Sequence, residues 1–479
     1  MTLLHRYRAS LLPRKVLRVS SSRGLLLLEA LGIDRAVFSA LAARGWSLLA
    51  GPITLVIIAR ALTPQQQGFY YTFASVMALQ IFLDMGLSYV LVQFVSHEFA
   101  KVRWTADGGI EGDSFATARL LEILRTSTKW YMVASALLVL LFVPLGFIFF
   151  GSQGQDGVSF AWRLPWTLYV VTSALNLSLV PLYSIVEGGG LVAEINQFRF
   201  VQTVLANLVI WGALLAGAGL FVPSIMGFAS VVSALVWAGA TKRQLLRLIF
   251  KTPRSVDPKG TVPSFDWWRE LWPMQWRIAI SWISGYFIFQ LYTPVLFRYQ
   301  GAVIAGKMGM TLTLTNALTQ IAMAWVTVRA PKFGMLVAGS KWRELDALFA
   351  RVFRQSVLVV LLGAVALVGV VWFVQQYTAS GQRILPAAEV AFMAGSVVLN
   401  HVIGAIAVYL RAHKRDPFVW LSLIGAVLMG ISTWLLGQYL SSVGVVIGTF
   451  AINLCYGVPT AVWLWYKLRR EWHGEPVST

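Results

Sequence analysis

The sequence is poor in charged residues and has almost no cysteine. Only 12% of its 479 residues are charged, whereas soluble proteins carry roughly a quarter, and this scarcity excludes a soluble multidomain enzyme. Cys455 is the one cysteine, which excludes an intramolecular disulfide. Acidic residues are scarce too, because 20 Asp and Glu stand against 39 Lys and Arg, for a formal net charge of +19 at pH 7. The chain is instead 57% hydrophobic. A composition that is both strongly hydrophobic and strongly basic needs an explanation.

Signatures of catalysis and of nucleotide binding are also missing. The sequence has no HExxH motif, no zinc-ligand spacing and no glycine-rich dinucleotide loop, so it predicts no catalytic residues, no metal site and no cofactor. The segment GAVIAGKM at 301–308 matches a phosphate-binding loop up to Lys307, but Met308 stands where a Ser or Thr would hold magnesium. We expect this segment to open a membrane helix. His401 lies inside an apolar run and is predicted to be a core histidine bonded to a neighbouring helix.

Long hydrophobic runs are what the sequence has in quantity. About 20 apolar residues cross the roughly 30 Å hydrocarbon core of a membrane. About twelve runs meet this length, namely 37–60, 69–96, 130–150, 164–187, 199–219, 222–241, 276–298, 303–328, 355–376, 386–410, 416–437 and 443–466. No connection between them has room for a sizeable soluble domain. The runs therefore predict an all-α polytopic membrane protein: a channel, a carrier or a membrane enzyme.

Basic residues occur in every second connection between the predicted spans. They include Lys101, Arg103, Arg119, Lys242, Arg243, Lys341, Arg343, Arg411 and Arg469. Because Lys and Arg in short loops are retained in the cytoplasm, both ends of the chain are expected there. Most of the positive charge therefore reflects the orientation of the chain in the membrane. Its plain consequence is attraction to anionic membrane lipids. It does not indicate a nucleic-acid partner.

The chain is predicted to consist of two halves with parallel topology. An amphipathic pattern at 119–129 enters the third span, and a similar one at 344–354 enters the ninth. The expected organisation is a basic cytoplasmic segment, a six-helix bundle, a cytoplasmic linker, a second six-helix bundle and a cytoplasmic tail, at 1–36, 37–241, 242–275, 276–466 and 467–479.

Polar residues recur at helical spacing on the first, second, seventh and eighth spans, so that each set shares one helix face. We take them as candidates to line a substrate cavity: Arg44, Thr54, Gln80, Asp84, Arg277, Ser281, Lys307, Thr311, Thr315, Asn316 and Thr319. A second interpretation stays open, in which hydroxyls and amides join helices to one another. In that interpretation Arg44 and Asp84 form a structural ion pair, and Arg277 extends its charge to the membrane surface.

The charges inside the predicted spans favour an anionic ligand. Basic residues outnumber Asp84 and Glu187 there, and they are Arg44, Arg199, Arg277 and Lys307. A guanidinium offers paired donors that match a phosphate. The hypothesis is therefore a basic cavity, lined with hydroxyls, that suits a diphosphate-linked sugar better than an organic cation.

The first predicted hairpin carries a resemblance to a known family. The segment RALTPQQQGFYYTFASVMALQIFLDMGLSYVLVQFVSHE at 60–98 resembles the polysaccharide biosynthesis proteins. These are the oligosaccharide-lipid (O-antigen type) flippases of the multidrug/oligosaccharidyl-lipid/polysaccharide exporter superfamily. The matching residues are Leu62, Thr63, Pro64, Gly68, Tyr70, Gly86 and Leu87. In the second half, 271–310 looks like the start of the family's second bundle, and APKF at 330–333 resembles the segment that follows its eighth span.

The resemblance implies two six-helix bundles around a central cavity that opens alternately to the two sides of the membrane. It implies a flippase for a polyprenyl-diphosphate-linked oligosaccharide in the bacterial cytoplasmic membrane, acting as a monomer with membrane lipids and with polysaccharide assembly machinery as partners. Only Arg44, Asp84, Arg277 and Lys307 lie where the family's substrate-holding role could be carried over. Two alternatives remain: a multidrug/cation antiporter of the same superfamily, and a membrane glycosyltransferase or polymerase that acts on lipid-linked sugars.

Overall fold

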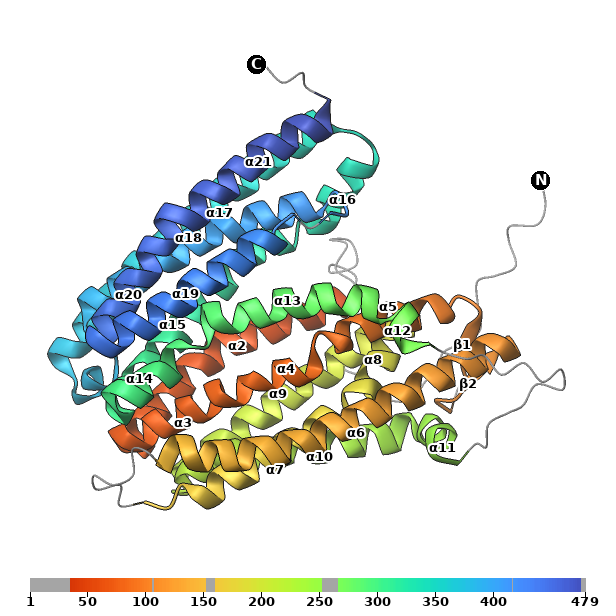
Figure 1. Cartoon of the computed structure of the whole chain (residues 1–479), viewed down its shortest axis with the longest axis horizontal. Coiled ribbons are helices and arrows are strands. Elements are labelled where there is room, and N and C mark those ends of the chain that lie inside the picture. The colour runs from red at the N-terminus through yellow and green to blue at the C-terminus, as the bar shows by residue number, and fades with distance from the viewer. Residues whose placement is uncertain (1–34, 106, 152–159, 252–265, 416, 475–479) are drawn as a thin grey trace, which may run out of the picture.

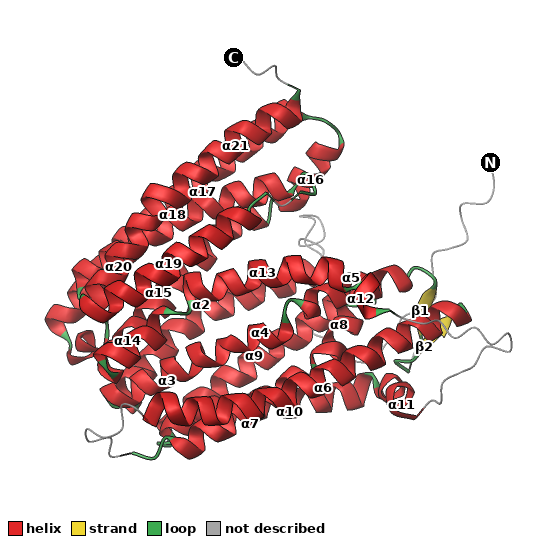
Figure 2. Ribbon diagram, in the orientation of Figure 1, coloured by secondary structure: helices red, strands yellow, loops and turns green. Residues whose placement is uncertain are grey.

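A computed structural model describes residues 35–105, 107–151, 160–251, 266–415 and 417–474, without the side chains of 35–44, 47, 48 and 248–251. Nearly all of the predicted segment 1–36 and the central part of the predicted linker, 252–265, lie outside the described residues. The rest of the chain is helical apart from one short hairpin (Figure 2).

The elements of the first half are α2 (Arg35–Ala61), α3 (Pro64–Met77), η1 (Ala78–Gln80), α4 (Ile81–Asp84), α5 (Leu87–Glu98), β1 (Val102–Trp104), β2 (Ile110–Gly112), α6 (Ser114–Gly151), α7 (Arg163–Ser178), α8 (Val180–Gly188), α9 (Val192–Leu215), η2 (Gly219–Phe221), α10 (Val222–Thr241) and α11 (Arg243–Lys251). Those of the second half are α12 (Trp267–Glu270), α13 (Trp272–Phe289), α14 (Tyr292–Gln300), α15 (Ala302–Thr327), α16 (Ala330–Ala338), α17 (Trp342–Tyr377), η3 (Ala379–Arg383), α18 (Ala387–Arg411), α19 (Val419–Tyr439), α20 (Ser441–Ile452), η4 (Asn453–Gly457) and α21 (Val458–His473).

The helices confirm the prediction of an all-α polytopic membrane protein. Among the described residues, nine helices are long and apolar enough to cross a membrane, and two bent pairs pass the same test together. The first predicted span corresponds to α2, whose described apolar part is Leu49–Ala61. The amphipathic patterns at 119–129 and 344–354 are continuous with the spans that follow them, so α6 and α17 reach about 57 Å and about 54 Å.

The second span begins at a cap and is broken in its middle. At the start of α3, Gln66 N–H donates to the Thr63 hydroxyl at 3.2 Å, and Thr63 N–H donates to the Gln66 side chain at 3.0 Å. Pro64 follows in the first turn, where its missing N–H costs nothing. Between α4 and α5 the chain bends by 44°, because Met85 and Gly86 both have positive φ angles, of 47° and 69°.

The two helix bundles form a V (Figure 1). We call the end that carries the basic connections the basic end; it includes β1, β2, α11, α12, α16 and the last turns of α21. At the opposite end, α3 of the first bundle packs against α14 and α15. Toward the basic end the bundles diverge, so that α16 and α21 lie far from α5 and the β1–β2 hairpin (Figure 1).

Aromatic rings and glycines hold the bundles together at the opposite end. Phe69 of α3 is fully buried, and its ring centroid lies 5.0 Å from that of Phe297 on α14. A Cβ added to Gly68 would lie 1.9 Å from the Ala302 carbonyl oxygen, and one added to Gly306 would lie 2.8 Å from the Gly68 nitrogen. No larger residue fits at this crossing of α3 and α15 without a shift of backbone.

Gly68→Ala is expected to destabilise the protein by about 1–3 kcal/mol, because the added methyl group meets a backbone carbonyl that cannot rotate away. The measurement is the thermal unfolding midpoint of the purified protein in detergent. Gly51→Ala on α2 is the control, since a Cβ there would meet nothing within 4 Å. Equal midpoints for the two variants would contradict the tight crossing.

Candidate functional site

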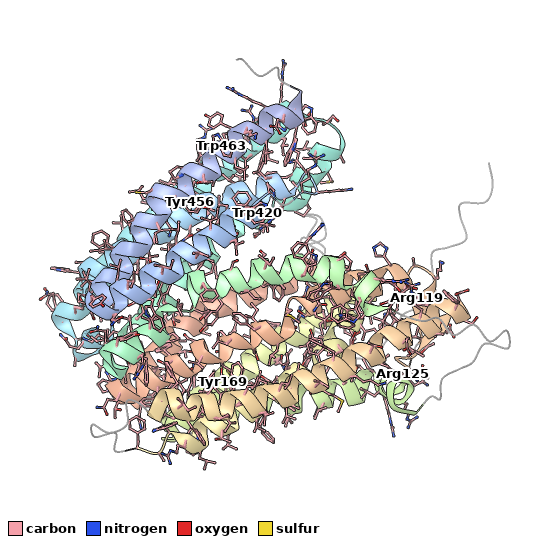
Figure 3. All side chains as sticks on the ribbon, viewed as in Figure 1. Arg119, Arg125, Tyr169, Trp420, Tyr456 and Trp463 are labelled. Carbon is pink, nitrogen blue, oxygen red and sulfur yellow. The ribbon has the colours of Figure 1, made fainter. Side chains whose placement is uncertain are left out.

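Several of the basic residues described near the basic end form salt bridges with acids of the same region. Arg119 forms a salt bridge with Glu98 at 3.0 Å and another with Glu270, which attaches α12 to the first bundle. Other pairs include Lys242–Glu194 at 2.9 Å, Arg199–Glu187 at 2.8 Å and Arg469–Asp346 at 2.7 Å. Arg119 and Arg125 lie near this end in Figure 3, whereas Tyr169 lies much nearer the opposite end. Arg199, counted from the sequence as a cation inside a span, is therefore balanced by a neighbour.

Asp84 is turned into the first bundle. It ends α4, just before the break in the second span, and is only 8% exposed. Its carboxylate accepts a hydrogen bond from the Tyr131 hydroxyl of α6 at 2.5 Å and another from the Ser88 hydroxyl of α5 at 3.1 Å. These contacts join three helices of one bundle. The side chain of Arg44 is outside the described residues, so the predicted Arg44–Asp84 pair stays a prediction.

Thr54 lies in a contact between helices of the first bundle. Its hydroxyl donates to the Ala50 carbonyl at 2.7 Å and accepts from the Trp211 indole of α9 at 2.8 Å. Both hydrogen-bonding roles of the hydroxyl are thereby used. Thr54 thus joins α2 to α9, as in the interpretation in which polar residues connect helices and do not line a cavity. Gln80, in the η1 turn of the second span, is half-buried.

The threonines of α15 bond to their own helix. The hydroxyls of Thr311, Thr315 and Thr319 each donate to the carbonyl four residues earlier, at 2.9, 3.1 and 3.0 Å. Thr311 and Thr315 are buried, and the Thr311 hydroxyl also accepts from Leu385 N–H at 3.3 Å. Hydroxyls satisfied in this way add little polarity to a cavity wall.

Asn316, by contrast, is exposed on the face of α15 that is turned to the first bundle. Gly306 and Gly309 contact α3, and Asn316 follows Gly309 by seven residues, which returns to the same face about 10 Å closer to the basic end. Gln320 continues this face and is also exposed. Lys307, which directly follows Gly306 of the glycine crossing, is half-buried. GAVIAGKM therefore opens a membrane helix, as expected, and Gly306 within it packs directly against Gly68.

Arg277 and Ser281 lie on a face of α13 that leads to a cavity of the second bundle. Arg277 is exposed, with its guanidinium carbon 5.5 Å from the Trp276 ring centroid, and Ser281 is half-buried. Ile288 shares this face by helical spacing. It lines a cavity of about 180 Å³ between α13, α18, α19 and α20, together with Asn400, Ser422, Asn453 and Tyr456.

These polar cavity residues show no pattern in the sequence that predicts them. Asn400 and Asn453 are single amides within long apolar runs, and only the packing of α18 against α20 and η4 brings them to one space. The side-chain nitrogen of Asn453 is buried without a hydrogen-bond partner, a feature that no sequence pattern displays. His401 behaves as predicted, because its Nε2 lies 2.9 Å from the Ser356 hydroxyl of the neighbouring helix α17.

The similarity of this chain to known proteins lies in its fold. No protein-family model matches the sequence, and no curated protein sequence matches it. Among solved structures, an inward-facing multidrug resistance MATE family transporter of the MOP superfamily is similar, with 13% identity, a TM-score of 0.61, and 90% of this chain and 96% of that chain covered. The lipid II flippase MurJ in an inward closed conformation is similar with 11% identity, a TM-score of 0.57, and 89% and 87% covered.

The chain has the fold of these transporters. A fold shared with a MATE transporter of the MOP superfamily and with the flippase MurJ agrees with the all-α membrane fold expected from the sequence. At these identities the likeness extends to the fold alone.

Tyr131→Phe is expected to lower the free energy of unfolding by about 1–3 kcal/mol, because it removes a donor from the buried Asp84 carboxylate. Denaturation of the purified protein, followed by tryptophan fluorescence, measures the change. Tyr466→Phe, at a side chain 51% exposed on α21, is the matched control and should be neutral. A neutral Tyr131→Phe would show that Asp84 does not depend on this hydrogen bond.

Proposed function

We propose that the protein is a flippase that moves a polyprenyl-diphosphate-linked oligosaccharide, a precursor of a polysaccharide or lipopolysaccharide, across the bacterial cytoplasmic membrane by alternating access. The observation that carries this proposal is the V arrangement, in which the bundles touch at the opposite end and diverge toward the basic end. The fold shared with the MATE transporter and with MurJ supports it.

The charge of the surfaces between the bundles supports an anionic substrate. The ionisable candidate residues described on α13 and α15 are Arg277 and Lys307, and both are basic. Arg277 is exposed, and the amides of Asn316 and Gln320 are exposed on α15. Guanidinium and amide donors suit a diphosphate and the hydroxyls of a sugar. Because the bundles diverge, a polar head group could lie between them while its lipid tail remains in the bilayer.

A cation antiporter is the second candidate function, and Asp84 is the observation that favours it. A buried carboxylate at a helix break, bonded to Tyr131 and Ser88, is the kind of intramembrane ionisable group that marks proton relays. The same contacts also serve to join α4, α5 and α6. The charge at Arg277 and Lys307 opposes a cationic substrate, so we place the antiporter second.

Arg277→Ala is expected to reduce transport about tenfold or more, because a buried or partly buried charge-assisted contact to phosphate contributes on the order of 1.5–3 kcal/mol. The measurement is the amount of lipid-linked sugar retained in the cytoplasmic leaflet of host cells that carry the variant in place of the wild-type gene. Arg103→Ala, which removes an equal charge in the β1–β2 hairpin, should transport normally. Deletion of the gene without any such accumulation would reject the proposed substrate class.

A covalent link across the opposite end is expected to stop transport, because alternating access requires the contact of α2 and α15 to open. Ala59 and Met310 lie in one apolar cluster there. The test joins Ala59→Cys to Met310→Cys with a short, reducible bifunctional reagent in a Cys455→Ser background. Transport should fall to background and return on reduction, and each single-cysteine variant should be unaffected. Full transport by the linked protein would exclude the mechanism.

A further inference from the structure

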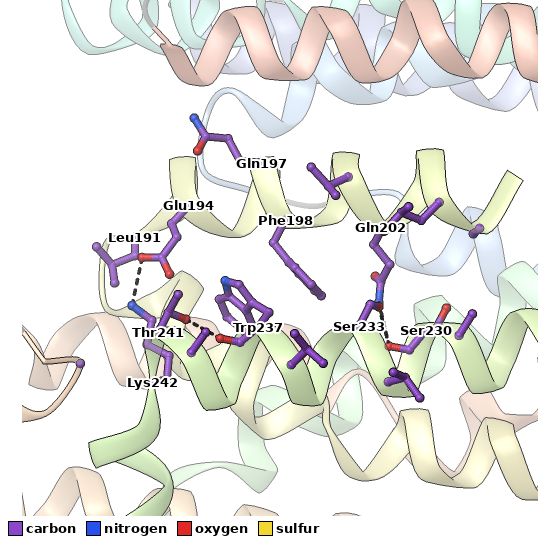
Figure 4. A pocket seen from close by; sticks show the side chains of 18 of the residues that line it. Leu191, Glu194, Gln197, Phe198, Gln202, Ser230, Ser233, Trp237, Thr241 and Lys242 are labelled. Atoms are coloured by element: carbon purple, nitrogen blue, oxygen red, sulfur yellow. Dashed lines mark hydrogen bonds and ion pairs between the residues drawn. The ribbon is translucent and has the colours of Figure 1, made fainter. Parts of the chain in front are cut away.

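A long groove runs between α9 and α10 in the first bundle (Figure 4). Its volume is about 1220 Å³, which exceeds the 300–1,000 Å³ of typical small-molecule pockets. Along α9 it extends from Glu194 to Val209, a length of about 22 Å at 1.5 Å per residue. The groove lies away from the surfaces on which the two bundles face each other, so it belongs to neither the candidate cavity nor the glycine crossing.

Three side-chain contacts bridge the two helices. From the basic end inward they are the Glu194–Lys242 salt bridge at 2.9 Å, the stacked rings of Phe198 and Trp237 with centroids 4.6 Å apart, and the hydrogen bond from Gln202 to the Ser233 hydroxyl at 3.1 Å. All six residues line the groove. The side chains of these contacts lie between α9 and α10 and form the floor of the groove. The groove is open over this floor along both helices.

The walls of the groove are apolar and exposed. Val201 is 52% exposed, Phe228 61% and Val236 66%. Both helices are long and apolar enough to span a membrane, so the medium that meets these walls is hydrocarbon. A lipid chain therefore has the chemistry and the length for this part of the groove.

The mouth of the groove at the basic end is acidic, in a protein whose net charge is +19. Glu194 uses one carboxylate oxygen for Lys242, and its other oxygen is buried without a hydrogen-bond partner. Asp107 also lines the mouth; the Thr105 hydroxyl donates to it at 2.6 Å and lowers the pKa of its carboxyl. Lys242 is only 5% exposed and lies 4.9 Å over the Trp104 ring. The charged residues that line the groove are therefore two carboxylates, Glu194 and Asp107, against one ammonium group, Lys242.

We propose that this groove binds one membrane phospholipid with a zwitterionic, ammonium-bearing head group. The acyl chain lies along Val201, Phe228 and Val236, and the ammonium group meets the carboxylates of Glu194 and Asp107. The exposed amide of Gln197 lines the mouth and offers donors to the phosphate. An anionic phospholipid would place its negative charge against the same carboxylates, and this repulsion makes the site selective.

Native mass spectrometry of the full chain, purified in mild detergent, tests the proposal. The probes are phosphatidylethanolamine and phosphatidylglycerol with identical acyl chains. One phosphatidylethanolamine should stay bound per protein, with about tenfold preference over phosphatidylglycerol, as expected for one charge-assisted contact. Glu194→Gln should abolish most of this preference. Glu187→Gln is the matched control, since Glu187 is paired with Arg199 on the same side and does not line the groove.

A second pair of variants tests the groove without changing charge. Ala206→Trp fills the groove at mid-depth and should reduce lipid retention about tenfold. Leu208→Trp adds the same side chain to a lipid-facing position of α9 outside the groove, where it should have no effect. Equal retention by these two variants would overturn the proposal. So would equal or stronger binding of phosphatidylglycerol, or a co-purifying transmembrane polypeptide that holds the groove in place of lipid.

Discussion

The crossing of α3 and α15 through glycine is the constraint on which the rest of the structure depends. Gly68 brings the α3 backbone so close to Ala302 that the two bundles share a core at this end, where Phe69 also meets Phe297. Close approach of backbones through small residues is how membrane helices associate when burial from water provides no driving force. Because α3 and α15 touch here and diverge beyond, this crossing sets the V shape.

The broken second span places its two parts against different neighbours. Its first part, α3, packs on α15 at the opposite end, and after the bend at Met85 and Gly86 the helix α5 packs on α8 of its own bundle. Gly86 also approaches Ile278 of α13, since a Cβ there would lie 2.4 Å from that side chain. One span thus contacts both the start of α15 and the start of the second half. A rocking motion of the bundles would have to change the contacts at both places.

The residues behind the family resemblance have structural roles at these same places. Thr63 and Pro64 start α3, Gly68 makes the crossing, and Gly86 makes the break. Each role depends on backbone geometry and not on a ligand. A motif of this kind therefore carries information about the fold and little about the substrate, and the substrate proposal depends on the side chains of α13 and α15 for this reason.

Hydrophobic length and helical period are local properties of the chain. The residues alone therefore predict the membrane-spanning helices, their number to within one or two, and the continuity of α6 and α17 with their amphipathic starts. Helical spacing also named Arg277 and Asn316 as candidates, and both side chains are exposed in the structure. The partners of buried polar groups come from packing instead: Asp84 bonds to Tyr131, Thr54 joins α2 to α9, and Asn453 lies in a cavity. Helical spacing groups residues on one face of a helix, but the neighbour that this face meets depends on segments distant in the sequence. The groove between α9 and α10 depends on such packing as well.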